Sequence, residues 1–262
     1  MPAELLRILV LGSGTSVGVP VIGCECAVCR SPDRRDQRLR PSVLVCYHGR
    51  NILIDTTPDF RQQALRAGLR RLDAVLFTHA HADHIMGLDD VRPFNFRQNA
   101  AIPIYGSPET LKTIGRVFDY VFSDSQAQSS IPRLEVRELD GAPFDLHGLT
   151  VTPVPLEHGR GWVYGFRFGP AAYLTDHSEI PESSLDLLGD LDVLFLDALR
   201  RRPHPTHTTL ERALQYVEQL APRRAFLTHI CHDLPHEETE RSLPPHVRLA
   251  YDGLEVIVEV NG

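Results

Sequence analysis

The segment Thr78-His79-Ala80-His81-Ala82-Asp83-His84 is a dense cluster of potential metal ligands. It holds three imidazoles and one carboxylate, and both groups are common protein ligands for transition metals. One tetrahedral site seldom takes so many ligands from a single short loop, so the spacing favours two metals about 3.5–4 Å apart, as in two-metal hydrolysis. The apolar run Ala74–Phe77 precedes the segment and predicts a buried strand, at whose end α/β proteins place ligand sites. The alternative, a solvated histidine-rich turn, does not explain that apolar run.

Apolar and alternating runs bounded by Gly, Pro and polar residues predict a series of strands along the chain. They are expected at about residues 6–11, 42–47, 51–55, 74–77, 103–105, 149–154, 163–168, 171–174, 193–196, 224–227 and 256–260. Helical patterns are expected at about residues 59–67, 108–122, 181–188 and 209–220. Strands interrupted by helices, without a strict βα repeat, are typical of an α/β protein in which helices cover two mixed β-sheets.

The motif T-H-x-H-x-D-H after an apolar strand resembles the signature of the metallo-β-lactamase superfamily. Three further polar residues end apolar runs in the order that this family shows: His158 after Leu156-Glu157, Asp176 after Tyr173-Leu174-Thr175, and His229 after Phe226-Leu227-Thr228. The resemblance covers about residues 6–260. It implies the family's fold, a four-layer αβ/βα sandwich of two mixed β-sheets.

The resemblance also implies an assignment of metal ligands. It gives each of two divalent ions, zinc or manganese, its own set: His79, His81 and His158 for the first, and Asp83, His84 and His229 for the second. Asp176 would bridge both ions through its two oxygens. Two dications that share one water lower its pKa and yield a bridging hydroxide nucleophile. The same ions would neutralise phosphate oxygens as charge builds in the transition state.

A seventh histidine fits the proton donor that a poor leaving group requires. His207 lies just before an amphipathic helical pattern and resembles the mobile histidine loop of the phosphodiesterase branches of the superfamily. Asp197, at the end of the predicted strand 193–196, is the candidate partner that would orient the imidazole and raise its pKa. We therefore expect His207 and Asp197 to be catalytic. The alternative is a helix cap at the neighbouring threonines, with His207 merely exposed.

Three cysteines form a compact C-x-C-x-x-C motif at Cys24, Cys26 and Cys29. Three thiolates this close together suit a tetrahedral structural zinc once a fourth ligand arrives from elsewhere. Disulfides are disfavoured because the chain has an odd number of cysteines, five, and its sequence does not predict a secretion signal.

Two adjacent residues, Cys231 and His232, are candidates for the fourth ligand of that zinc. The cysteine motif together with a late T-H-x-x-H resembles the cyclic-phosphate phosphodiesterases of the carbon–phosphorus lyase pathway, a branch of the superfamily. In that branch a histidine three residues beyond the last catalytic histidine completes the zinc site, and its counterpart here is His232. Cys231 stands beside it and would be a chemically sound alternative. We expect His232 to be the ligand.

Composition sets limits on the kind of protein. The chain has 262 residues, 42% hydrophobic and 23% charged, which fits a single globular domain over residues 1–262 with a zinc-knot loop at about 12–41. No apolar stretch is long enough to predict a membrane span, and the N-terminal residues do not predict a secretory signal, so a cytoplasmic location is expected. A formal charge of −7 argues against a broad nucleic-acid interface. A homodimer is implied by the resemblance alone.

These observations predict an enzyme, a metal-dependent phosphodiesterase that hydrolyses small cyclic or ribosyl phosphate diesters with His207 as general acid. An endonuclease of the tRNA 3′-processing type would need a long basic arm, which the sequence lacks. A thioester or lactone hydrolase on the same scaffold would not need His207 and Asp197. A non-catalytic carrier resembling the pyrroloquinoline quinone biosynthesis protein would have a degraded motif, whereas every ligand is present here.

Overall fold

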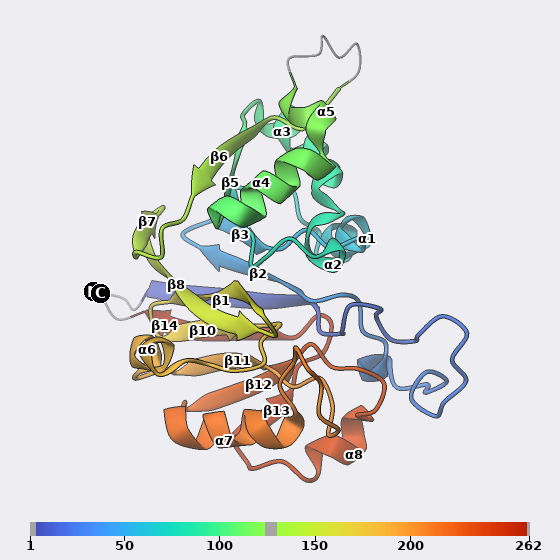
Figure 1. Ribbon diagram of the computed structural model, residues 1–262. Coiled ribbons are helices and arrows are strands. Elements are labelled where there is room, and N and C mark those ends of the chain that lie inside the picture. The colour runs from blue at the N-terminus through green and yellow to red at the C-terminus, as the bar shows by residue number, and fades with distance from the viewer. Residues whose placement is uncertain (1–3, 124–129, 261–262) are drawn as a thin grey trace.

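The computed structural model describes residues 4–123 and 130–260, and within them two seven-stranded sheets stack face to face (Figure 1). Helices cover the outer face of each sheet, so the layers run helix, sheet, sheet, helix. The expected α/β four-layer sandwich of two mixed sheets is therefore confirmed. In the described part of the chain, no helix combines the length and the apolar character that crossing a lipid bilayer requires.

The first sheet has the strand order β14-β1-β2-β3-β4-β5-β6. Its strands are β1 (Glu4–Gly12), β2 (Ser42–Tyr47), β3 (Arg50–Ile54), β4 (Ala74–Leu76), β5 (Ile102–Gly106), β6 (Leu134–Glu138) and β14 (Glu255–Val260). Pairing is antiparallel from β14 to β3 and parallel from β3 to β6. The carboxyl ends of β3 and β4 therefore lie at the same edge.

The second sheet repeats this plan with the strand order β13-β12-β11-β10-β9-β8-β7. Its strands are β7 (Phe144–Leu146), β8 (Leu149–His158), β9 (Gly161–Phe168), β10 (Ala171–Leu174), β11 (Val193–Asp197), β12 (Arg224–Thr228) and β13 (Val247–Leu249). Pairing is antiparallel from β7 to β10 and parallel from β10 to β13. Each sheet thus brings a set of parallel strand ends to its edge, where ligand sites form.

The helices associated with the first sheet are α1 (Phe60–Arg66), α2 (Ala82–Ile85), α3 (Arg92–Gln98), α4 (Pro108–Val117) and α5 (Asp119–Phe122). Those on the second sheet are α6 (Glu182–Leu185), α7 (Leu210–Leu220) and α8 (His236–Glu240). The longer ones begin at hydroxyl caps: the Ser107 side chain accepts from the Thr110 N–H, and Thr209 accepts from the Arg212 N–H. The loop between β1 and β2, residues 13–41, stands out from the side of the sandwich (Figure 1).

Strand β2 shows how the sequence builds these layers. Val43, Val45 and Tyr47 point into the core between the two sheets, while Leu44 points to the helix side of its own sheet. A strand that is buried on both faces reads as a continuous apolar run rather than an alternating one. Each such valine or leucine stabilises the fold by roughly 1.5–3 kcal/mol when fully buried.

Several elements differ from expectation. The sequence predictions omitted β6, β7, β13, α2, α3 and α8. β6 is a mostly exposed edge strand rich in charge, and the others are short, so apolar periodicity gives little signal. The helical pattern at 108–122 breaks at Phe118 into α4 and α5. β8 extends to His158 despite Pro153 and Pro155, because β7 pairs only with its first residues and leaves a free edge for proline.

Candidate metal centre

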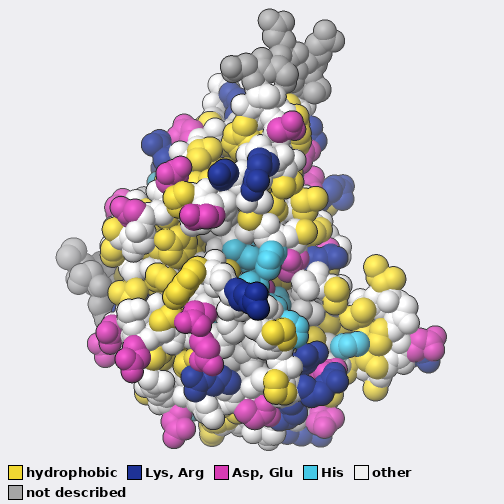
Figure 2. Space-filling view, in the orientation of Figure 1, with side chains coloured by type: hydrophobic (Ala, Val, Ile, Leu, Met, Phe, Trp, Pro, Cys, Tyr) yellow, Lys and Arg dark blue, Asp and Glu magenta, His cyan; other side chains and the backbone are white. Residues whose placement is uncertain are grey.

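The first expected ligand set comes together at the opening of the site. His79 and His81 lie in the loop after β4, and His158 ends β8. The His79 Nε2 and His81 Nδ1 atoms are 2.8 Å apart, and the His158 ring lies 5.3 Å from the ring of His79 and 5.1 Å from that of His81. His79 is buried while His81 is exposed, so this set forms the solvent-facing part of the centre. Figure 2 shows histidines gathered in a hollow near the middle of this face.

The second expected set lies deeper. Asp83 and His84 sit on α2, while Asp176 and His229 follow β10 and β12. Asp176 turns its two oxygens towards different histidines: Oδ2 is 3.3 Å from His84 Nε2, and Oδ1 is 3.2 Å from His229 Nε2. An Asp83 oxygen is 3.2 Å from the same His84 nitrogen. Asp176 also has an oxygen within ligand-sharing distance of His158, so it stands between the two sets.

Hydrogen bonds outside the cluster fix which nitrogen each imidazole presents. The His158 Nδ1–H donates to the Thr206 carbonyl oxygen at 2.9 Å, so its Nε2 keeps a free lone pair. His84 Nδ1 lies 2.7 Å from Asp55 Oδ2, and His79 Nδ1 lies 3.0 Å from the Thr78 hydroxyl, which itself donates to Asp55. Partners of this kind orient metal-binding histidines and increase their basicity.

The donor set fits divalent cations on two further observations. Nε2 of His84 and Nε2 of His229 are buried and form no hydrogen bond with the described residues, although carboxylate oxygens lie close by. Burial opposes protonation of both rings, yet the Asp176 carboxylate and other acids outweigh it. The pKa of His84 is raised well above its usual value and that of His229 to about 9. The site therefore attracts positive charge, and divalent ions would supply it.

Burial, followed by the neighbouring His84, holds the pKa of His79 well below its usual value. That imidazole is therefore neutral, which is the form that binds a metal. The set of His79, His81 and His158 therefore offers imidazole nitrogens, whereas the set of Asp83, His84, Asp176 and His229 also offers carboxylate oxygens. Both are chemically competent ligand spheres for divalent ions.

The backbone is strained at three residues of the centre. Asp55, Asp176 and His229 have φ values of 62°, 56° and 58°, in the left-handed region that side chains other than glycine rarely occupy. Each lies one or two residues beyond the end of a strand, β3, β10 or β12. Such residues cost on the order of 1–3 kcal/mol and cluster at functional sites, where the surrounding structure holds them in place.

Asp55 was missed by the sequence analysis, which placed it inside a strand. It is fully buried, and its carboxylate accepts from the Thr78 N–H at 2.9 Å, from the Thr78 hydroxyl at 2.8 Å and contacts His84 Nδ1. Burial raises the pKa of this carboxyl, while His84 and Thr78 favour its charged form. A polar residue that ends the apolar run Ile52-Leu53-Ile54 was the available signal.

Replacing Asp55 by asparagine is expected to weaken binding of divalent ions at this centre by about 10–100-fold, because outer partners of metal-binding histidines carry effects of that size. Metal titration against a competing chelator would measure it. Asp73→Asn is a matched control: its carboxylate is held by Arg50, Arg71 and the Asn51 N–H at the opposite end of the same strands. That variant should lose stability but retain metal affinity. Equal metal affinity in both variants and in the unchanged protein would contradict the assignment.

His207 lies beside both ligand sets and pairs with Asp197. Its Nδ1 is 3.1 Å from Asp197 Oδ2, and its ring stacks on that of His229 with centroids 4.6 Å apart. Asp197 is completely buried at the end of β11. The cap of α7 is Thr209, so His207 lies two residues before the capping position and inside the site. Its side chain keeps 12% exposure.

A buried histidine outside the two ligand sets, His177, supports the His207 loop. The Thr208 hydroxyl donates to the His177 carbonyl oxygen at 2.8 Å, and its oxygen lies 2.8 Å from His177 Nδ1. Burial lowers the pKa of His177 to about 4, so the ring is neutral. The backbone N–H of His177 also donates to Asp197 Oδ2 at 3.2 Å. His177 therefore holds both the Asp197 carboxylate and the loop that carries His207 in place through hydrogen bonds.

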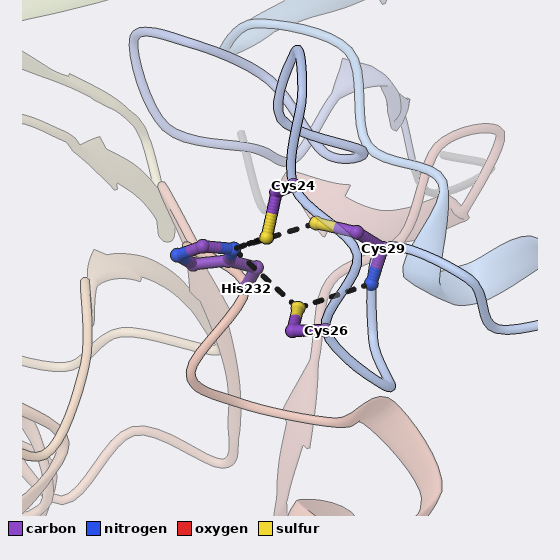
Figure 3. A group of neighbouring side chains, drawn as sticks. All are labelled: Cys24, Cys26, Cys29 and His232. Carbon is purple, nitrogen blue, oxygen red and sulfur yellow. Dashed lines mark hydrogen bonds between the residues drawn. The ribbon is translucent and has the colours of Figure 1, made fainter.

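The cysteine motif of the projecting loop lies against His232, which comes from the segment between β12 and α8 (Figure 3). His232 Nδ1 lies 3.3 Å from the sulfur of Cys24, 3.6 Å from that of Cys26 and 3.4 Å from that of Cys29. Zinc bonds of about 2.3 Å to sulfur and 2.0–2.1 Å to nitrogen at tetrahedral angles require separations of about 3.6 Å. Cys231 is outside this group, and its sulfur accepts from the Asp233 N–H at 3.3 Å. The geometry suits one tetrahedral ion.

Comparisons of the sequence and of the structure with known proteins point to the same family. Residues 50–230 match the family described as the beta-lactamase superfamily domain. A solved structure of a new diphosphatase from the PhnP family is 50% identical in sequence, has a TM-score of 0.92 and is covered over 98% of each chain. The Zn(2+)-bound PqqB of Methylobacterium extorquens is 21% identical with a TM-score of 0.77, covering 95% of this chain and 99% of that one, which shows a shared fold.

Among curated relatives, the octanoyltransferase of Porphyromonas gingivalis is 42% identical over 98% of this chain. The match occupies 52% of that protein. The chain spans about half the length of the curated relatives it matches.

Proposed function

This chain belongs to the beta-lactamase superfamily, and from that membership and the geometry of its site we propose that it is a dinuclear metal-dependent phosphodiesterase. It is a hydrolase of the metallo-β-lactamase fold. The proposed substrates are small cyclic or ribosyl phosphate diesters. The observation that carries the proposal is the hydrogen bond between His207 and the buried Asp197, directly beside both ligand sets.

The proposed ligands of the two ions are those expected from the sequence: His79, His81 and His158 for one, Asp83, His84 and His229 for the other, with Asp176 shared. Imidazole and carboxylate donors accept several divalent ions, and zinc and manganese are the candidates. When bound, the ions would supply a water of lowered pKa as nucleophile and would neutralise charge on the phosphate oxygens.

Proton transfer to the leaving oxygen is the step assigned to residues of this chain. Because His207 Nδ1 is committed to Asp197, Nε2 is the atom that carries the proton to the ester oxygen as its bond to phosphorus breaks. The Asp197 carboxylate accepts in turn from the backbone N–H of His177, and this contact fixes the orientation of the His207 imidazole. Since the His207 side chain retains contact with solvent, the proton can be replaced after each turnover.

We propose that Cys24, Cys26, Cys29 and His232 bind one structural zinc. The separations between donors support this, and the four ligands would leave no open coordination position for catalysis. We also propose that residues 1–262 form one domain in which the loop at about 12–41 carries this zinc. A cytoplasmic location and a homodimer are further proposals that rest on the sequence and the resemblance.

A second candidate function is hydrolysis of an acyl thioester. It is favoured by one observation, the 42% identity to a protein named octanoyltransferase. The match covers 52% of that protein, so the acyl transfer need not belong to the part that this chain resembles. The paired His207 and Asp197 favour the phosphodiesterase, because a thiolate leaves without a proton whereas an alkoxide does not.

The proposal is tested with a panel of cyclic, linear and diphosphate diesters, phosphomonoesters, thioesters and lactones, assayed on protein of measured metal content. We expect turnover of phosphate diesters that a chelator removes and divalent ions restore. Turnover of thioesters or lactones without any turnover of phosphate diesters would contradict it.

A further inference from the structure

The single tryptophan of this chain is conspicuously exposed beside the metal centre. Trp162 is 64% exposed, and it lies on β9 immediately after Gly161, the residue that pairs with His158 across the β8–β9 hairpin. An indole presents a large, rigid apolar face on which a planar ligand can stack. Its neighbour along the strand, Tyr164, donates its N–H to the Thr78 carbonyl oxygen at 2.9 Å, one residue before His79.

Trp162 forms one wall of a small cavity, which we call the tryptophan hollow. Its volume is about 210 Å³, and it is lined by Thr78, Ser107, Glu109, Pro155, Trp162 and Tyr164 together with Val163. Sites for whole drug-sized ligands measure roughly 300–1,000 Å³. The tryptophan hollow is therefore sized for one ring system rather than for a complete substrate.

The charge of the tryptophan hollow disfavours a phosphate as its occupant. Of the described residues that line it, none is lysine or arginine, and Glu109 contributes a carboxylate. A carboxylate repels phosphate but accepts hydrogen bonds from the amino or imino groups of a heterocycle. An aromatic face with a hydrogen-bond acceptor at its rim suits a planar nitrogen heterocycle.

A second cavity near the centre has the opposite character. The arginine hollow, of about 220 Å³, is lined by Arg200, Arg202 and His204, and also by Asp233 and the proposed zinc ligand His232. The ring of His204 lies 4.9 Å from that of His207. Arg202 is paired with Asp233, while Arg200 donates to the carbonyl oxygens of Arg202 and Pro203 and has no acidic partner among the described residues. The arginine hollow, beside His207, thus favours anionic groups of a substrate. The tryptophan hollow favours a planar ring of the same substrate.

We propose that Trp162 is a stacking platform for the nucleobase of a nucleotide substrate, whose reacting phosphate lies at the metal centre. This inference rests on the proposed function and narrows its substrate class to nucleoside phosphate diesters. Base–aromatic stacking accepts any base because every base has a π-face. Glu109, at the rim, can accept a hydrogen bond from the base.

Fluorescence tests the platform without any need for turnover. Because the chain has only one tryptophan, excitation of indole reports on Trp162 alone. Titration with adenosine 5′-monophosphate should change the emission saturably, and ribose 5-phosphate, which lacks the base, should not. No change with the nucleotide, or an equal change with the sugar phosphate, would overturn the proposal.

Kinetics test it on a matched pair of substrates that share one scissile bond: adenosine 2′,3′-cyclic phosphate and methyl riboside 2′,3′-cyclic phosphate. In Trp162→Ala, the ratio of kcat/KM for the first over the second should fall roughly 5- to 150-fold, the range of base–aromatic stacking. Trp162→Phe should restore part of that ratio. Phe96→Ala, at an aromatic residue that is 62% exposed on α3, should leave the ratio unchanged.

The outcomes separate the platform from the proposed function. Saturable fluorescence changes without hydrolysis of either cyclic phosphate would support the platform and contradict the phosphodiesterase. Hydrolysis of both compounds, with an equal loss in Trp162→Ala and no recovery in Trp162→Phe, would overturn the platform and leave the phosphodiesterase standing.

Discussion

His207→Ala is expected to slow hydrolysis of an alkyl or ribosyl phosphate diester by about 10²–10⁴-fold, the usual contribution of a general acid. A nitrophenyl diester should be slowed far less, because nitrophenolate is stable as an anion and leaves without a proton. Steady-state kinetics on both substrates measure the difference. The expectation follows from the 3.1 Å contact to Asp197, which leaves only one ring nitrogen of His207 for proton transfer.

Two controls accompany this variant. Asp197→Asn should show the same selectivity in weaker form, because the amide would misorient the imidazole without removing it. Metal content should stay unchanged in His207→Ala, since His207 is not a proposed ligand. Uniform loss on both substrates together with loss of metal would make His207 a ligand or a structural residue, and the phosphodiesterase would lose its main support.

Cys26→Ser is expected to lower the free energy of unfolding by several kcal/mol, because the binding energy of a structural zinc contributes directly to folding. Cys26 is exposed, so the substitution removes almost no apolar packing, and the loss should come from zinc. The Cys29 N–H, together with the nearby thiols, lowers the pKa of Cys26 to about 7, which favours the thiolate that zinc requires. Thermal or denaturant unfolding with zinc analysis measures the effect.

The fourth ligand can be decided by the same assay. His232→Ala should lose the structural zinc, whereas Cys231→Ala should keep it, because the Cys231 sulfur lies outside the ligand group. A Cys26→Ser protein that melts like the unchanged one but has lost catalysis would show that the cysteine motif is part of the active site instead. Retention of zinc in His232→Ala with loss in Cys231→Ala would reverse the assignment.

Much of this arrangement could be predicted because single strands carry strong local signals. Ala74–Phe77 is apolar throughout and runs directly into the histidine motif, so its burial and the position of the motif are encoded together. His158, Asp176 and His229 each end such a run, and the resemblance to the superfamily singled them out from other polar residues in the sequence. In the structure they lie at one edge of the sandwich. A local pattern suffices when the strand itself is buried on both faces.

Other structural features arise from contacts between residues far apart in the sequence, so no local sequence pattern predicts them. Asp55 becomes an outer partner of His84 only because β3 and β4 pair in parallel with a fixed register. The edge strand β6 is exposed and charged, so apolar periodicity does not mark it. Trp162 is an unremarkable aromatic residue in sequence and gains meaning only from the cavity beside Thr78.

Elemental analysis of gently purified protein counts the bound metals. We expect about three divalent ions per chain, two at the catalytic centre and one at the cysteine motif. A chelator should remove the catalytic pair first and abolish hydrolysis, and adding zinc or manganese should restore it. One ion or fewer per chain, with no gain in metal or activity when divalent ions are added, would contradict a dinuclear centre.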